Sequence, residues 1–342
     1  MNYKEKIKSA NPCRQNYLDS INDLVEKMHN CANVQRKTKV MRCIAQQETV
    51  RRELSEMLGW PLCESVRSPL SIESECLREE DGIRLSRVKF EIFSSFYFYG
   101  LFYEHIGKKL PLVIVQHGAM GTPEQCSGLL EEISTLNYNN VTERVLKRNV
   151  HIFVPQLLLW SQDRYDISYD RATIDAKLRQ VGSSITALEL YSLRCCLLHY
   201  SHTPYIDSNR MGMIGLSYGG FFTMMMMALD TTLKCGFSCC YYNDRRKFIF
   251  PDWSWKNSAE LFMDSELALL SYPRRLWITI GKNDDCFKVD GGMNEYVRLR
   301  EEMNLCGIND EWLSFSTFDG GHEFCKDDAL LDDFFDYLGG EK

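Results

Sequence analysis

The sequence predicts an α/β fold, a doubly wound and mostly parallel sheet, with an N-terminal helical arm in front of it. From about residue 112 onward, short apolar runs alternate with amphipathic stretches, which is the order of parallel strands joined by helices. A glycine-flanked serine stands at one strand-to-helix junction, residues 215–219. The first 75 residues show helical periodicity and no strand signal. We therefore divide the chain into an arm, residues 1–75, and a main domain, residues 76–342.

Length and composition favour a soluble enzyme. The 342 residues suffice for one large α/β domain with an appendage, or for two domains. A formal net charge of −7 gives no basic field that would favour nucleic acid. No apolar run approaches the ~18 residues of a membrane span. Residues 1–8 are charged and lack the apolar core of a signal peptide, so we expect a cytoplasmic protein without a membrane partner.

The cysteines indicate neither disulfides nor a metal site. There are 14, and two adjacent pairs, Cys195-Cys196 and Cys239-Cys240, lie inside apolar segments. Without a secretion signal, most are expected to be small buried side chains with free thiols. None forms a Cys-x-x-Cys pattern, so we expect no metal and no cofactor.

The arm carries an apolar stripe. Five of its residues recur at helical spacing: Leu18, Ile21, Leu24, Val25 and Met28. Residues 34–57 suit one amphipathic helix, which Gly59 and Pro61 would end. We expect the arm to pack on the main domain as a structural element, or to serve as a lid or as a dimerisation arm against a second subunit.

The main domain should begin with two antiparallel strands and continue as a parallel sheet. The expected strands are residues 83–93, 96–103, 112–116, 150–155, 211–214, 235–241, 276–280 and 312–318. The expected helices start at Pro123 after a Thr122 cap and then cover residues 183–200, 221–229, 258–271, 294–306 and 327–338. Irregular stretches are expected at residues 161–175 and 242–255.

The segment Gly215-Leu-Ser217-Tyr-Gly219 matches Gly-x-Ser-x-Gly, the pattern of a nucleophile elbow. A serine on a strained strand-to-helix turn has little room around it, so the residues two before and two after must be small. The turn holds the hydroxyl above the sheet, beside the backbone N–H groups of a helix N-terminus. An apolar strand before it and an apolar helix after it supply that context, so Ser217 is the candidate nucleophile.

A serine nucleophile needs a base, and the base needs a group that orients it. On this scaffold the chain order is serine, acid, histidine. Of seven histidines, His322 alone follows the acid candidates, and two glycines precede it. Asp284 and Asp285 both follow a predicted strand; we favour Asp284 as the acid and leave Asp285 as the alternative.

The oxyanion formed during acyl transfer needs two backbone N–H donors. One should be Tyr218, the residue after the nucleophile. The other should come from the loop after the strand that ends at Gln116, so from Ala119 or alternatively Met120. His117 in the same loop is expected to brace it rather than to transfer protons.

Five motifs between residues 83 and 338 carry a resemblance to a known family. They are His117-Gly118-Ala-Met-Gly121-Thr-Pro-Glu124, Tyr205-Ile-Asp207-Ser-Asn-Arg210, Gly215-Leu-Ser217-Tyr-Gly-Gly220, Gly281-Lys-Asn-Asp284 and Gly320-Gly-His322-Glu-Phe. Through them the chain resembles the α/β-hydrolase superfamily, and within it the branch of acetyl xylan esterases, dienelactone-hydrolase-like proteins and cephalosporin deacetylases. Dienelactone hydrolases proper use cysteine at the elbow, where this chain has Ser217.

The resemblance implies a serine hydrolase that cleaves small acyl esters, including acetylated sugars, through an acyl-enzyme. The expected partner is a small-molecule ester. A prolyl-oligopeptidase-like peptidase shares the triad order, but 75 residues are too few for a propeller, and no Glu-Glu pair is assignable to a peptide amine. A non-catalytic binding module would usually lack a triad member. A dinucleotide-binding fold is disfavoured because no Gly-x-Gly-x-x-Gly opens the first strand-to-helix turn.

Overall fold

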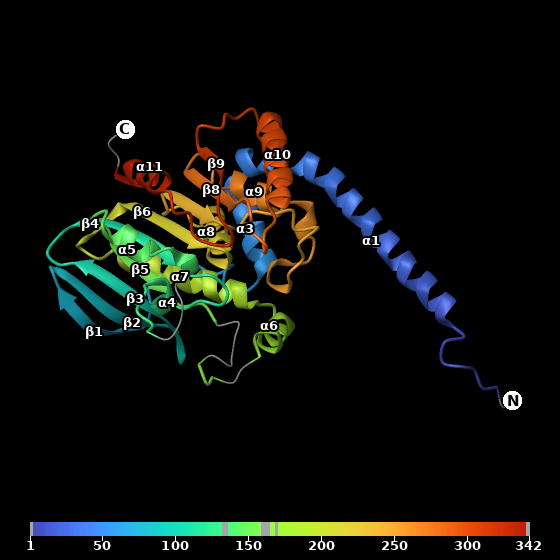
Figure 1. The fold of residues 1–342 in the computed structure, drawn as a ribbon, viewed down its shortest axis with the longest axis horizontal. Coiled ribbons are helices and arrows are strands. Elements are labelled where there is room, and N and C mark those ends of the chain that lie inside the picture. The colour runs from blue at the N-terminus through green and yellow to red at the C-terminus, as the bar shows by residue number, and fades with distance from the viewer. Residues whose placement is uncertain (1–2, 132–135, 159–164, 168–169, 340–342) are drawn as a thin grey trace.

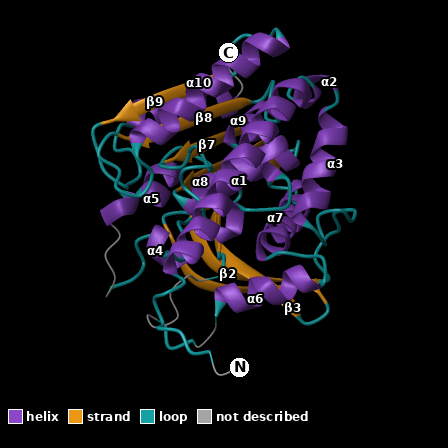
Figure 2. Cartoon of the chain, turned by 90° about the vertical axis from the view of Figure 1, so that its right-hand side faces the viewer, coloured by secondary structure: helices purple, strands orange, loops and turns teal. Residues whose placement is uncertain are grey.

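The computed structural model describes residues 3–131, 136–158, 165–167 and 170–339. In this part of the chain, nine strands form one sheet that helices cover on both faces (Figure 1). Figure 2 shows helices α7, α8, α9 and α10 in front of the twisted strands. None of the described helices is long and apolar enough to cross a membrane.

The strand order is β1-β2-β3-β5-β4-β6-β7-β8-β9. The strands are β1 Ser71–Glu80, β2 Ile83–Phe93, β3 Phe96–His105, β4 Leu110–Gln116, β5 His151–Pro155, β6 Ile206–Leu216, β7 Cys235–Cys239, β8 Arg275–Gly281 and β9 Leu313–Phe318. Strands β1, β2, β3 and β5 pair antiparallel, and the remaining pairs are all parallel. The predicted α/β class and mostly parallel sheet are therefore confirmed.

The helices divide between the two faces because neighbouring strand residues point to opposite sides. The helices of four or more residues are α1 Asn11–Lys39, α2 Arg42–Ala45, α3 Gln47–Leu58, α4 Pro123–Cys126, α5 Val141–Leu146, α6 Arg171–Gln180, α7 Ile185–Ser201, α8 Tyr218–Leu229, α9 Asp264–Leu269, α10 Val289–Cys306 and α11 Asp328–Gly339. Leu112 and Ile114 of β4 join a core with α3, α7, α8, α9 and α10, whereas Val113 and Val115 join a second core with α5 and α11. The sheet is doubly wound, as expected.

Three local expectations were wrong. Strand β1 begins at Ser71, inside the segment expected to be helical. All its residues are exposed, so its sequence has no apolar alternation that would predict a strand. It forms by pairing with β2, to which ion pairs such as Lys89–Glu73 add. The single helix expected over residues 34–57 is broken into the end of α1, α2 and α3. Helix α6 occupies part of the stretch expected to be irregular, of which residues 161–164 and 168–169 lie outside the described part of the chain.

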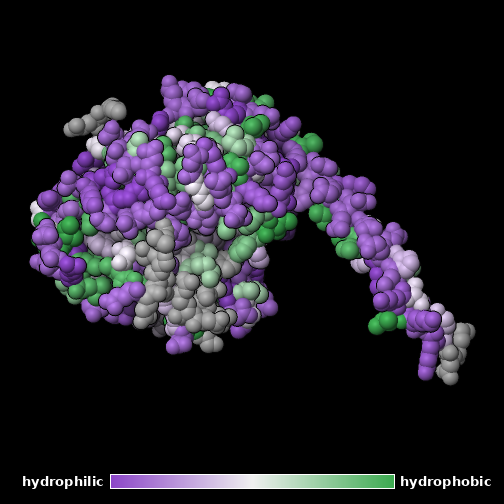
Figure 3. Space-filling view, in the orientation of Figure 1, coloured by the Kyte–Doolittle hydropathy of each residue, from purple (hydrophilic) through white to green (hydrophobic). Residues whose placement is uncertain are grey.

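The arm behaves as two different parts. Helix α3 packs into the core through Val50, Leu54 and Leu58, as expected. Helix α1 instead projects from the body, and every residue from 11 to 28 is exposed (Figure 1). Figure 3 shows hydrophobic side chains along this projecting helix. Residues 11–28 therefore do not pack on the described main domain, whereas the last turns of α1 do, with Arg36 buried against Glu266.

Candidate active site

The site is built around the turn that joins β6 to α8. Ser217 occupies this turn with φ 59° and ψ −122°, a strained backbone conformation for a non-glycine residue. A Cβ at Gly215 would lie 2.1 Å from the Gly219 carbonyl oxygen, and one at Gly219 would lie 2.3 Å from the Gln116 carbonyl oxygen. Backbone contact on both sides is the physical reason for the Gly-x-Ser-x-Gly spacing.

Two loops bring an acid and a base to Ser217. His322, in the loop after β9, has Nε2 2.8 Å from the Ser217 Oγ. Its Nδ1 is 2.9 Å from Oδ2 of Asp284, in the loop after β8. Asp285, the alternative acid, is exposed and makes no such contact with His322 in the described structure. The structure thus brings together the three side chains that the sequence singled out.

The Asp284 carboxylate is held in its ionised form. Its side chain is fully buried, and its Oδ1 accepts the N–H groups of Cys286 and Phe287, each at 2.8 Å. Burial alone would raise the pKa of Asp284, but the hydrogen bond and charge of His322, with these two N–H groups, lower it below its ordinary value. A carboxylate at Nδ1 favours the tautomer that leaves Nε2 to accept the serine proton.

The candidate oxyanion donors are backbone N–H groups of the loop after β4 and of the start of α8. Gly118 N donates to the Tyr138 hydroxyl at 3.1 Å, and Gly121 N donates to the Gly118 oxygen at 3.0 Å. Ala119 N has no hydrogen-bond partner among the described residues. Tyr218 is the first residue of α8, where N–H groups have no carbonyl in their own helix to bind. Ala119 and Tyr218 therefore remain the expected oxyanion donors, while Met120 also borders the cavity.

His117 braces this loop. Its Nδ1 lies 2.7 Å from the Gly118 oxygen, and its Nε2 accepts the N–H of Leu157 at 3.0 Å. Burial lowers the pKa of His117 to about 4, so the ring is neutral at neutral pH. A neutral, fully engaged ring fits the bracing role expected from the sequence.

The cavity beside Ser217 is small and carries little charge. Its volume is about 240 Å³. Besides Ser217 and His322, its lining residues are Gly118, Ala119, Met120, Gly121, Gln125, Asn137, Tyr138, Leu216 and Cys286. A Cβ at Gly121 would lie 2.0 Å from the Tyr138 hydroxyl oxygen, so any larger residue there would have to displace the Tyr138 side chain. Such a cavity suits a short, uncharged acyl group.

A buried polar network supports the elbow from below. The Tyr218 hydroxyl donates to Asp252 Oδ2 at 2.8 Å, and Arg171 Nη2 lies 3.0 Å from the same hydroxyl. Arg171 also pairs with Asp252 at 2.9 Å and with Glu189 at 3.3 Å. No sequence motif indicates this network, because its members lie far apart along the chain.

The tryptophan beside this network has a packing role. Trp253 packs its ring 6.1 Å from that of Tyr218, so it is part of the core beneath the elbow.

Cys240 contacts the backbone of the histidine loop. Cys240 Sγ lies 3.2 Å from the Glu323 oxygen and 3.6 Å from the Gly321 oxygen, on either side of His322. Among the described residues, one group of three side chains could contact a metal ion, namely Cys240, Asp284 and His322. The Asp284 and His322 atoms of that group already bind each other, so we assign them to the hydrogen-bonded triad. All 14 cysteines are free thiols.

Comparison with known proteins places this geometry on a known fold. No family model matches the chain, and no curated protein matches it. A Bacteroides fragilis protein assigned as an acetyl xylan esterase shares 16% identity and a TM-score of 0.62, over 82% of this chain and 76% of its own. A glucuronoyl esterase from Solibacter usitatus shares 12% identity and a TM-score of 0.57, over 84% and 91%.

A third solved structure is similar over nearly its whole length. Acetyl xylan esterase 1 from Thermoanaerobacterium sp. JW/SL YS485 shares 14% identity and a TM-score of 0.52, over 85% of this chain and 98% of its own. At such identities the likeness concerns the fold. The chain has the α/β-hydrolase fold, as the resemblance of its motifs implied.

Proposed function

We propose that this protein is a serine esterase that cleaves small acyl esters, acetylated carbohydrates included, through an acyl-enzyme. The observation that carries the proposal is the continuous hydrogen-bonded chain from the Ser217 Oγ through His322 to Asp284, with distances of 2.8 and 2.9 Å. A hydroxyl bonded to an oriented imidazole at the mouth of a small cavity is what acyl transfer requires.

The proposed reaction has two steps. In the first, His322 Nε2 takes the Ser217 proton as Oγ attacks the ester carbonyl, and the same nitrogen then gives that proton to the departing alcohol. In the second, His322 activates a water that releases the acid and frees the serine. In both steps the oxyanion would accept the N–H groups of Tyr218 and Ala119, where loss of one donor typically costs ~10²–10³ in rate.

The cavity supports short acyl groups over peptides. No acidic side chain is among the described residues that line it, so it offers no carboxylate to bind a peptide amine. The acetyl xylan esterases among the structural neighbours act, by name, on acetylated carbohydrate, which is consistent with a small acyl group. A non-catalytic binding role would leave the assembled triad unexplained.

Covalent labelling tests the proposal directly. A fluorophosphonate should label Ser217, identified by mass spectrometry of the labelled peptide, and a panel of p-nitrophenyl esters should show preference for acetate over longer acyl chains. Ser217→Ala should abolish labelling and lower kcat by up to ~10⁶. Cys286 supplies a thiol that also lines the cavity, and Cys286→Ser should retain both probe labelling and ester hydrolysis.

Turnover should also survive a chelator, because the serine mechanism uses no metal. A Ser217→Ala protein that still takes the probe and still hydrolyses ester would refute the proposed nucleophile.

A further inference from the structure

The side chain of Tyr218 is held by two buried charged groups. Tyr218, whose backbone N–H is one expected oxyanion donor, is buried, and its hydroxyl donates to Asp252 Oδ2 at 2.8 Å. Arg171 Nη2 donates to the same hydroxyl at 3.0 Å, and Arg171 Nε binds Asp252 Oδ2 at 3.1 Å. A phenol hydroxyl that donates one hydrogen bond and accepts another is fixed in direction. The first turn of α8 is therefore positioned by a side-chain contact as well as by the elbow turn.

The same arginine reaches the segment that follows β5. Arg171 Nη1 donates to the Leu158 oxygen at 2.7 Å, and the Leu158 N–H donates to Glu189 Oε1 at 2.6 Å. Glu189, in α7, also pairs with Arg171 Nη2 at 3.3 Å. A planar guanidinium with its N–H donors in a fixed fork can bind several partners at set positions, which an ammonium on a flexible stem cannot do. Arg171 thus fixes the place of Leu158 relative to Tyr218.

The residue before Leu158 continues this path to the second expected donor. The Leu157 N–H donates to His117 Nε2 at 3.0 Å, so Nδ1 carries the proton of the neutral ring and donates to the Gly118 oxygen at 2.7 Å. The peptide bond between Gly118 and Ala119 is trans, and in a trans peptide the carbonyl oxygen and the following N–H point in opposite directions. Holding the Gly118 oxygen therefore sets the direction of the Ala119 N–H.

Arg171 also acts on His117 through its charge. Burial is the main cause that lowers the pKa of His117 to about 4, and the positive charge of Arg171 lowers it as well. The neutral ring is the form that can accept the Leu157 N–H at Nε2. The arginine therefore favours the protonation state on which the path depends, in addition to fixing the segment after β5.

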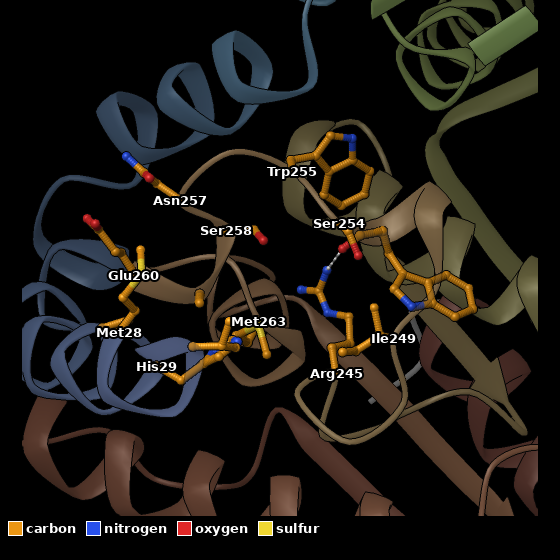
Figure 4. Close-up of a pocket in the computed structure, with 14 residues that line it drawn as sticks. Met28, His29, Arg245, Ile249, Ser254, Trp255, Asn257, Ser258, Glu260 and Met263 are labelled. Carbon is orange, nitrogen blue, oxygen red and sulfur yellow. Dashed lines mark hydrogen bonds between the residues drawn. The ribbon is translucent and has the colours of Figure 1, made fainter. Parts of the chain in front are cut away.

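The carboxylate at the other end of this path is fixed in turn. Asp252 lies in the short helix η2 Pro251–Trp253 and is buried. Arg245 Nη1 donates to the Trp253 oxygen at 3.2 Å, which is the dashed bond of Arg245 in Figure 4. Arg245 Nε pairs with the buried Asp264 at 3.0 Å. Because its loop is held in this way, Asp252 can determine the position of the tyrosine hydroxyl that it binds.

We propose that Arg171 is a positioning residue that sets the distance between the two oxyanion donors, the backbone N–H groups of Tyr218 and Ala119. It binds the Tyr218 side chain on one side and, on the other, the segment after β5 that holds His117 and so the loop of Ala119. The inference rests on the proposed acyl transfer, in which an oxyanion forms between these donors. Because a misplacement of about 1 Å can cost ~10²-fold in rate, such a residue affects catalysis without touching the substrate.

Two variants of graded severity test the proposal. Tyr218→Phe removes only the hydroxyl and leaves the Arg171–Asp252 pair in place, whereas Arg171→Lys keeps the charge but loses the fork that binds both segments. With p-nitrophenyl acetate, kcat should fall by about 10-fold for the first and about 100-fold for the second, with KM changed by less than about twofold, because the donors act on the transition state.

Arg194→Lys is the matched control. Arg194 pairs with Asp230 at 3.0 Å, and Asp230 caps the opposite end of α8 from Tyr218. This variant makes the same conservative change in an ion pair of the same helix, away from both oxyanion donors. Its kcat and KM should therefore match those of the wild type.

A transition-state analogue separates positioning from a merely structural role. When a trifluoromethyl ketone binds, the Ser217 Oγ adds to its carbonyl carbon, the serine proton passes to His322 Nε2, and the carbonyl oxygen becomes an oxyanion between the two donors. The inhibition constant should rise in proportion to the loss of kcat/KM, so by about 100-fold for Arg171→Lys. A smaller fraction of correctly folded protein would lower the measured kcat but leave the inhibition constant unchanged.

The outcomes separate this inference from the proposed function. A wild type that neither takes a fluorophosphonate at Ser217 nor hydrolyses ester would overturn the esterase proposal, and this inference with it. If the wild type does both, inhibition constants of Tyr218→Phe and Arg171→Lys that equal the wild-type value would overturn this inference alone. An equal rise in the Arg194→Lys control would overturn it too. Should Arg171→Lys fail to fold, Tyr218→Phe decides by the same two measurements.

Discussion

The elbow region and the N-terminal arm place their side chains by different means. At the elbow, backbone contacts at Gly215 and Gly219 fix Ser217, and short loops after β8 and β9 deliver Asp284 and His322. In the arm, a long helix is bound to the main domain at its last turns, and its apolar stripe is exposed in the described structure. The contrast shows that a site built from local turns can be recognised within one chain, whereas an exposed apolar stripe does not by itself identify what would cover it.

The largest effect is expected at the triad acid. Asp284→Asn removes the charge that fixes the His322 tautomer, and should lower kcat by ~10⁴ while substrate binding changes little. Asp285→Asn is the matched control, since its side chain is exposed and makes no contact with His322 in the described structure. Steady-state kinetics on p-nitrophenyl acetate measure both. If Asp285→Asn were the more damaging change, the acid would have to be reassigned.

The sequence predicts those strands and site residues whose pattern lies in neighbouring residues of the chain. Strand β4 was predictable because both its faces are buried, so Leu112 to Val115 are all apolar. Strand β1 was not, because all ten of its residues are exposed and its pairing with β2 decides its conformation. The serine, acid and histidine stood in recognisable turns.

The side chains that pack and bind around the triad could not be predicted from such local patterns. Arg171 and Asp252 are 81 residues apart, and no motif links them. Cys240 likewise gave no sign that it would hold the backbone beside His322, since it stands in an apolar run that suits any buried thiol.

The second-largest effect is expected on the stability of the protein when Arg36, which binds the last turns of α1 to the main domain, is replaced. Arg36→Met keeps much of the side-chain volume but leaves the buried carboxylate of Glu266 without its cation. Breaking a buried pair in this way typically costs about 3–5 kcal/mol of unfolding free energy. Urea denaturation should show this loss, and Lys37→Ala, one residue on and exposed, should change stability by less than about 0.5 kcal/mol.

An Arg36→Met protein as stable as the wild type would mean that the ion pair at the base of α1 contributes nothing to the stability of the main domain. Helix α1 would then be an appendage that the main domain does not need for its stability.

The smallest effect, and the most specific to pH, concerns His117 in the oxyanion loop. Burial lowers the pKa of His117 to about 4, whereas in the unfolded chain it returns to about 6.5. Between these values the unfolded state binds more protons than the native state, so this histidine's contribution to stability falls as the pH drops through the window from 6.5 to 4. The full loss is roughly 3 kcal/mol.

His117→Gln keeps an oxygen that can accept the Leu157 N–H but cannot titrate. Its stability should therefore fall less steeply with acid, and the gap in unfolding free energy between wild type and variant should narrow by roughly 3 kcal/mol from pH 7 to pH 4. Urea unfolding across that range measures it, with exposed His202→Gln as the control whose slope should match the wild type. Parallel curves for wild type and His117→Gln would show that the ring is protonated alike in both states, and would contradict its role as a neutral brace of the loop that carries Ala119.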